Sequence, residues 1–260
     1  MLSTSLKSMT EVYATEFSLI PKSFLFENYI EAMQRGNWPR YFFNSFYLTV
    51  LSVVISLIIN SSAGFAFGRL YFKGRDFIFI LTLIGIMVPP QVTMLPVYVI
   101  LKYIPFAGGN DFLGRGGLGL VDSHFGLLLP YIAGSFGVFL FRQFFMNFPS
   151  ALDDAAKMDG LNRVQTYYKI YIPLSGPVFA SLIALKATHT WCDYTWPLIL
   201  ISTDKLFTVQ LALTKFRTYY ETDWPLLMAA TTLTILPLVI TFLSVQKHFI
   251  RGIVTTGIKG

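Results

Sequence analysis

Long apolar blocks alternate with short charged segments along this chain, a pattern typical of a protein that crosses a lipid bilayer several times. A hydrocarbon core of about 30 Å needs roughly 20 helical residues. Five blocks meet that length, at residues 41–67, 77–101, 124–141, 170–201 and 225–245. The pattern predicts an all-α, polytopic transmembrane helix bundle with about five spans. Pro89, Pro90 and Pro96 should kink the second span.

Composition supports lipid as the main solvent. Of 260 residues, 54% are hydrophobic and 13% are charged, whereas soluble domains carry about 25% charged residues. The single cysteine, Cys192, excludes a disulfide framework and a cysteine metal cluster within the chain. The basic residues are scattered between the apolar blocks and form no stripe, so we expect no nucleic-acid partner.

The charged segments predict the orientation in the membrane. One set holds nine Lys/Arg and nine Asp/Glu, in residues 1–40, 102–123 and 202–224. The other set holds ten Lys/Arg and four Asp/Glu, in residues 68–76, 142–169 and 246–260. Because cytoplasmic loops are enriched in Lys and Arg, we expect the second set and the C-terminus to be cytoplasmic. Residues 1–7 read like the polar exit of a span, so we also expect about 20–30 further residues before Met1, forming one more helix.

Several patterns that could indicate an enzyme are better explained otherwise. Gly114, Gly116 and Gly119 match a dinucleotide fingerprint but fall in a loop between spans, and no P-loop occurs. His189, Cys192 and Asp193 share one face of a predicted helix, where a polar face toward a water-filled path or a neighbouring helix is favoured over a thiol hydrolase. The sequence indicates no catalytic residue and no metal site.

Residues 148–177 carry the most specific pattern. Pro149 and Ser150 suit the start of a helix, and Asp153 and Asp154 fall in its first turns, where the helix dipole favours acids. Gly160 suits the end of that helix, and a second short helix is expected to follow. The segment predicts a compact helix–turn–helix on the cytoplasmic side.

This segment resembles the EAA loop of ABC importer permeases. The matching residues are Asp154-Ala155-Ala156, Asp159-Gly160, Ile172-Pro173-Leu174 and Pro177, with Asp154 in place of the commoner Glu. Further similarities include Asn44-Ser45, Phe67-Gly68-Arg69 and Trp191-Cys192-Asp193-Tyr194, and they extend over nearly the whole chain. The resemblance is strongest to the maltose-type carbohydrate branch.

The resemblance implies the type I importer permease fold, in which six spans are expected. Residues 1–260 would form one transmembrane domain, with an external segment (1–40), a cytoplasmic coupling loop (148–177) and a cytoplasmic C-terminal tail (246–260). The coupling contacts to an ATPase would come from Asp153, Asp154, Ala155, Ala156, Lys157, Met158, Asp159 and Gly160. The tail contacts would come from Gly257, Lys259 and Gly260.

The resemblance also implies the partners and the location. They are a second homologous permease, two ATPase subunits and a periplasmic or extracellular sugar-binding protein, assembled in the bacterial cytoplasmic (inner) membrane. ATP and Mg would bind to the ATPase subunits, and this chain would hold no cofactor.

The substrate path is open to more than one interpretation. Polar side chains inside a span usually face a path or a partner, which makes Lys186, His189, Trp191, Asp193 and Tyr194 candidates. Packing or snorkelling explains Lys186 and Asp193 equally well, and the partner permease could hold the sugar instead. The alternative function is a self-contained secondary transporter or channel, which has no need of residues 148–177.

Overall fold

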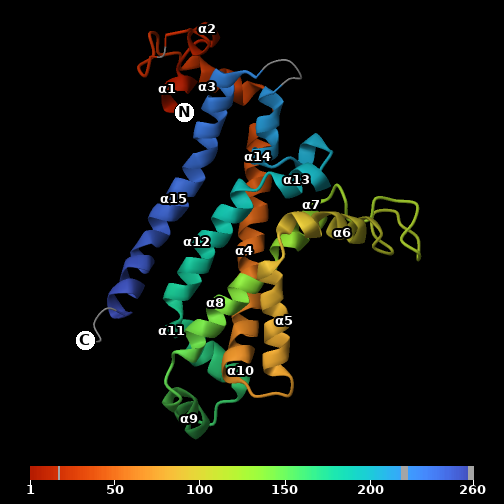
Figure 1. Cartoon of the computed structure of the whole chain (residues 1–260), viewed down its shortest axis with the longest axis vertical. Coiled ribbons are helices and arrows are strands. Elements are labelled where there is room, and N and C mark those ends of the chain that lie inside the picture. The colour runs from red at the N-terminus through yellow and green to blue at the C-terminus, as the bar shows by residue number, and fades with distance from the viewer. Residues whose placement is uncertain (17, 218–221, 257–260) are drawn as a thin grey trace.

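The computed structural model describes residues 1–16, 18–217 and 222–256, in which helices are joined by loops (Figure 1). α1 (Leu2–Ser5), α2 (Met9–Val12) and α3 (Glu27–Gln34) lie at one end of the molecule, here called the α1 end. α9 (Ala151–Met158) lies at the opposite end, called the α9 end. The 32-residue α4 (Trp38–Arg69) runs between the two ends.

In the part of the chain that the structure describes, two helices are long and apolar enough to cross a membrane, α4 and the Trp224–Ser244 part of α15 (Trp224–Thr256). Three bent pairs bring the total to five if each pair is one span. They are α5 (Arg75–Met87) with α6 (Pro90–Lys102), α7 and η1 (His124–Leu128, Leu129–Tyr131) with α8 (Ser135–Met146), and α10, η2 and α11 (Arg163–Thr166, Tyr167–Tyr171, Ile172–Leu174) with α12 (Gly176–Cys192). The prediction of an all-α bundle with about five spans is therefore confirmed.

The predicted kink in the second span is a sharp break of 105° between α5 and α6. Val88 ends α5 in an extended conformation, with ψ at 118°. A residue before proline is held in that region because the proline ring blocks the helical one. Pro90 then occupies the first turn of α6, where its missing N–H costs nothing. Pro96 lies inside α6.

The fourth apolar block is not one continuous helix to residue 201, as the sequence suggested. α12 ends at Cys192, and Asp193 has an extended backbone. The Asp193 Oδ1 atom accepts a hydrogen bond of 2.7 Å from the backbone N–H of Thr195, which starts the separate short helix α13 (Thr195–Leu200). Asx side chains compete for backbone donors in this way, so Asp193 does not share a helical face with His189.

The fifth apolar block continues further than predicted. α15 extends as a helix to Thr256. The predicted tail contacts Gly257, Lys259 and Gly260 lie outside the described residues.

The middle of α4, from Thr49 to Gly64, buries mainly small and polar side chains and turns large apolar side chains outward. Ser52, Ser56 and Asn60 are buried, whereas Ile58 is exposed. This is the reverse of a soluble helix. It suits lipid, because lipid tails solvate large apolar side chains and leave close packing and hydrogen bonds to hold helices together.

The contact between α4 and α8 depends on two glycines. A Cβ atom at Gly64 would lie 2.5 Å from the Phe141 Cβ atom and 2.9 Å from the Arg142 backbone nitrogen. A Cβ atom at Gly137 would lie 2.4 Å from the Asn60 Nδ2 atom. The two helices can approach this closely only because neither position carries a side chain.

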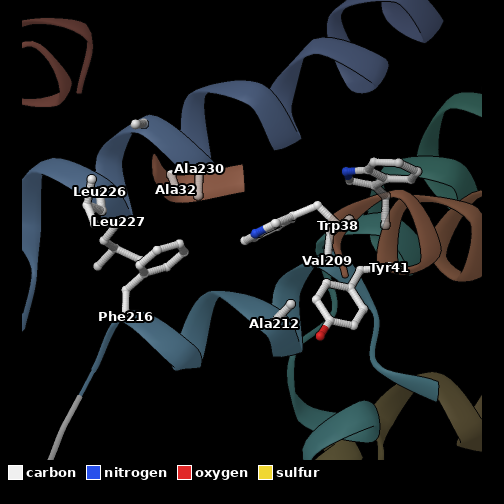
Figure 2. Packing of buried hydrophobic residues seen from close by; sticks show 11 residues of the cluster. Ala32, Trp38, Tyr41, Val209, Ala212, Phe216, Leu226, Leu227 and Ala230 are labelled. Carbon is white, nitrogen blue, oxygen red and sulfur yellow. The ribbon is translucent and has the colours of Figure 1, made fainter. Parts of the chain in front are cut away.

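A hydrophobic cluster closes the α1 end. It contains Ala32, Trp38, Tyr41, Trp191, Val209, Ala212, Phe216, Leu226, Leu227, Ala229 and Ala230. Figure 2 shows the Trp38 indole extending from α4 into the space between α15 and α14 (Val209–Ala212). The adjoining η3 (Asp204–Leu206) and η4 (Leu213–Phe216) are tied to α4 through the Tyr41 hydroxyl, which donates to Asp204 at 2.8 Å and accepts from Lys215 at 2.6 Å.

We expect the Gly64→Ala substitution to lower the free energy of unfolding by about 1–3 kcal/mol, the usual cost of overpacking. The added methyl group must push α4 and α8 apart, because a backbone atom of Arg142 blocks it. Thermal unfolding of the purified protein in detergent measures the effect. Gly176→Ala is the matched control, since a Cβ atom there meets nothing within 4 Å. Equal melting temperatures for both variants would contradict the packing described here.

Candidate functional site

α9 is a short amphipathic helix with ends that the sequence defines. Asp153 and Asp154 lie in its first turn and Lys157 in its last, as the helix dipole favours. Gly160 has a φ angle of +70°. The backbone N–H of Gly160 donates to Lys157 and that of Leu161 donates to Ala156, at 3.0 and 2.9 Å, the two bonds of a Schellman motif. The predicted end of the helix at Gly160 is confirmed.

The predicted second short helix is also present. α10 begins with a capping box, in which the side chains of Asn162 and Gln165 each accept a hydrogen bond of 2.9 Å from the other's backbone N–H. The chain then passes through the π-helical turn η2 and α11 into α12. The α9 end is therefore connected to the α12 span through helical structure that bends by 77° between Leu174 and Gly176.

α9 turns one face to the bundle and leaves the others exposed. Ala156 is buried, while Asp154, Ala155, Lys157, Met158, Asp159 and Gly160 are exposed. The Met158 side chain is 89% exposed, which is unusual for a large apolar residue. Of the two alanines expected to contact an ATPase, Ala155 is exposed and Ala156 is buried.

Asp153 does not belong to the exposed face. Its carboxylate forms an ion pair with Arg69, the last residue of α4, and accepts a hydrogen bond of 2.8 Å from the Tyr171 hydroxyl. A hollow of about 410 Å³ lies beside these residues, lined by groups that include Gly68, Asp154 and Arg163. Asp153 was expected to contact an ATPase. In the structure, both of its carboxylate oxygens are instead bonded within the chain.

Four side chains, those of Tyr131, Lys186, His189 and Asp193, form a second cluster near the C-terminal end of α12. The Tyr131 hydroxyl donates a hydrogen bond of 2.6 Å to Asp193. The Lys186 Nζ atom lies 5.9 Å from the centre of the Tyr131 ring, and the His189 ring packs edge-on against it at 6.2 Å. The structure thus brings Lys186, His189 and Asp193 together around a tyrosine that the sequence analysis did not single out.

The two remaining substrate-path candidates lie elsewhere. Trp191 is buried in the cluster at the α1 end, and its indole N–H donates to the Thr234 backbone carbonyl at 2.9 Å. It therefore connects α12 to α15, and it also lines a hollow of about 420 Å³ together with Phe46, Val53 and Pro237. Tyr194 is exposed and lines a hollow of about 250 Å³ together with Gln210, Arg217 and Trp224. Among residues 1–16, 18–217 and 222–256, no three His, Cys, Asp or Glu side chains are placed to hold a metal ion.

Comparison with known proteins decides the family. Residues 60–255 match the family described as "Binding-protein-dependent transport system inner membrane component". The chain belongs to this family. It is thus the permease subunit of an ABC importer of the bacterial inner membrane, which works with a binding protein and with separate subunits that hydrolyse ATP.

Curated relatives are similar over nearly the whole permease. The arabinooligosaccharides transport system permease protein AraQ of Bacillus subtilis is 34% identical over 100% of this chain and 89% of the relative. The lactose transport system permease protein LacG of Rhizobium radiobacter is 29% identical over 88% of this chain and 78% of the relative. The sn-glycerol-3-phosphate transport system permease protein UgpE of Brucella suis is 30% identical over 97% of this chain and 88% of the relative.

A solved structure shares the fold. A chain of a bacterial ABC transporter that imports the acidic polysaccharide alginate superimposes with a TM-score of 0.79, covering 95% of the permease and 88% of that chain at 24% identity.

The sequence analysis missed Arg69, Tyr131 and Tyr171 as members of these sites. Arg69 stood within the Phe67-Gly68-Arg69 similarity and carried a signal, because it is a charge at the end of a span. Tyr131 and Tyr171 carried none, since each is one of 14 tyrosines in a chain where aromatic residues favour membrane boundaries.

The left-handed backbone at Gly160 leads to a prediction with an internal control. Valine resists a positive φ angle by about 1–2 kcal/mol, whereas asparagine adopts it more readily. A Cβ atom at this position meets nothing within 4 Å, so backbone strain is the cost within this chain. In reconstituted transporter, Gly160→Val should uncouple ATP hydrolysis from transport while the chain stays inserted, and Gly160→Asn should stay close to wild type. Normal transport by Gly160→Val would contradict the role of this turn.

Proposed function

We propose that the permease imports a sugar or oligosaccharide in a complex with a second homologous permease and two ATPase subunits. The relatives support this substrate class, because the names of three of them specify arabinooligosaccharides, lactose and sn-glycerol-3-phosphate. All three are small, hydroxyl-rich molecules. They include a phosphate ester, so the substrates to be tested have to cover anionic as well as neutral molecules.

The exposed face of α9 is the observation that carries the coupling role. Met158 and Asp154 project from it into solvent, while Ala156 anchors the opposite face to the bundle. An apolar knob beside a carboxylate suits a cleft that offers an apolar pocket and a cation. We assign that cleft to the ATPase subunit, with Asp154 as the acid that pairs with it. From the family resemblance, Gly257, Lys259 and Gly260 would make a second contact between the ATPase subunits.

The cluster around Tyr131 is the proposed substrate path. Lys186, His189 and Asp193 supply hydrogen-bond donors and acceptors inside a span, where such groups usually serve a path. The Tyr131 ring is buried and its hydroxyl is bonded to Asp193, so it positions these side chains. The exposed ring of Tyr194 is the better surface for stacking against a sugar.

Transport in proteoliposomes tests this function. The complete complex, supplied with its binding protein and ATP, should take up one saccharide class from a panel of arabino-oligosaccharides, lactose, alginate oligosaccharides and sn-glycerol-3-phosphate. Lys186→Gln should raise the half-saturation concentration for uptake with basal ATP hydrolysis unchanged, because it removes the ammonium group of Lys186 from the path and leaves α9 intact. Uptake without ATP or ATPase subunits would contradict the proposal and indicate a secondary transporter.

The proposed orientation places the α9 end in the cytoplasm. In a Cys192→Ser background, which removes the single native thiol, cysteines replacing exposed Lys73 and Arg163 should be protected from an impermeant thiol reagent in sealed cells. A cysteine replacing exposed Arg115 should react. We expect this because residues 68–76 and 142–169, which contain positions 73 and 163, carry more Lys and Arg than Asp and Glu, as is typical of cytoplasmic loops. Reaction at position 163 in sealed cells would overturn this orientation.

A further inference from the structure

One side chain of α9, that of Asp153, bonds this helix to two other elements of the chain. Both oxygens of Asp153 are engaged, Oδ2 with the Arg69 guanidinium and Oδ1 with the Tyr171 hydroxyl at 2.8 Å. Arg69 is the last residue of α4, and Tyr171 is the last residue of η2. A single carboxylate on α9 is thus bonded to the ends of two different membrane-associated elements.

The Arg69 guanidinium is placed to make this bond strong. Its side chain is only 11% exposed, and its Nη1 atom also donates to the Phe148 carbonyl at 3.1 Å. Its Cζ atom lies 5.4 Å from the centre of the Tyr171 ring. A charge pair with little solvent contact is screened less than an exposed pair, and removing one partner leaves the other charge unsatisfied.

The neighbouring acid provides the contrast. Asp154 pairs with Lys157, but these side chains are 69% and 74% exposed. Exposed pairs of this kind contribute little. Two adjacent aspartates on α9 therefore differ in role, since one is bonded inward and the other is available to a partner.

The inward bond gives α9 a mechanical connection to the spans. Arg69 continues directly into α4, which packs against α8 and α12. Tyr171 continues through α11 into α12. A second tie reinforces the first, because the hydroxyls of Ser61 on α4 and Tyr167 on η2 share a hydrogen bond of 2.6 Å. A displacement of α9 would pull on α4 and α12 together.

We infer that Arg69, Asp153 and Tyr171 form a coupling lock, in which these three positioning residues transmit the movement of α9 to the α4 and α12 spans. The inference rests on the proposed function of α9 and adds residues that contact neither ATPase nor substrate. Asp153 acts through Arg69 and Tyr171, whereas Asp154 acts on the partner.

The experiment compares Asp153→Asn with Asp154→Asn in the complete complex. Asparagine keeps the size of each side chain and removes its charge. We expect Asp153→Asn to leave co-purification of the ATPase subunits at the wild-type level and to lower the stimulation of ATP hydrolysis by loaded binding protein about fivefold or more, the lower range of measured coupling between sites. Asp154→Asn should instead reduce the amount of ATPase that co-purifies.

A double-mutant comparison separates the lock from a general loss of stability. If Arg69 and Asp153 act as one unit, Arg69→Ala with Asp153→Ala should lower stimulation no more than either single change. Tyr171→Phe, which loses only a hydroxyl, should give a smaller loss of the same kind. Normal stimulation in Asp153→Asn, or additive losses in the double variant, would overturn the lock. A wild-type complex that retains no ATPase subunit would instead refute the proposed function of α9.

Discussion

The bond between Arg69 and Asp153 connects the two parts of the molecule that a driven permease requires. On one side is α9, a short helix with an exposed face and no catalytic group. On the other is α4, which runs the length of the bundle and packs against α8, α12 and α14. In the proposed function, α9 receives work from the ATPase subunit through contacts, so the stiffness of this connection would limit how much movement reaches the spans.

That stiffness depends on how the spans are packed. Lipid offers no hydrophobic driving force between helices, so association has to come from close contact and polar bonds. Gly64 and Gly137 supply the close contact between α4 and α8, and Asn60 and Ser56 share a hydrogen bond of 2.8 Å along the same face of α4. Near α9, Phe65, Phe145 and Tyr171 pack into one cluster, so the lock is supported by tightly packed aromatic side chains.

The apolar blocks were sufficient to predict the helical bundle, and the loop pattern at residues 148–177 was sufficient to predict α9 and its end at Gly160. Prolines predicted the break between α5 and α6 because their effect on the preceding residue is local. The end of α12 was missed because Asp193 stops the helix through a side-chain bond to Thr195, which no hydrophobic pattern reports. The inward turn of Asp153 was missed for a related reason, since Arg69 lies 84 residues earlier in the chain. The contact of Trp191 with α15 was missed because a tryptophan beside polar residues suits both a sugar path and a helix contact.

In the proposed complex, the exposed face of α9 contacts the ATPase subunit. Site-directed cross-linking tests this contact most directly, with Met158→Cys in the Cys192→Ser background and a short thiol-to-amine reagent applied to the assembled complex. Met158 is the choice because its side chain is 89% exposed. We expect an adduct between the cysteine at position 158 and the ATPase subunit. A cysteine replacing exposed Arg115, in the loop far from α9, should form no adduct with the ATPase subunit. An adduct of position 158 with the external binding protein, or none with the ATPase in an active complex, would contradict this contact.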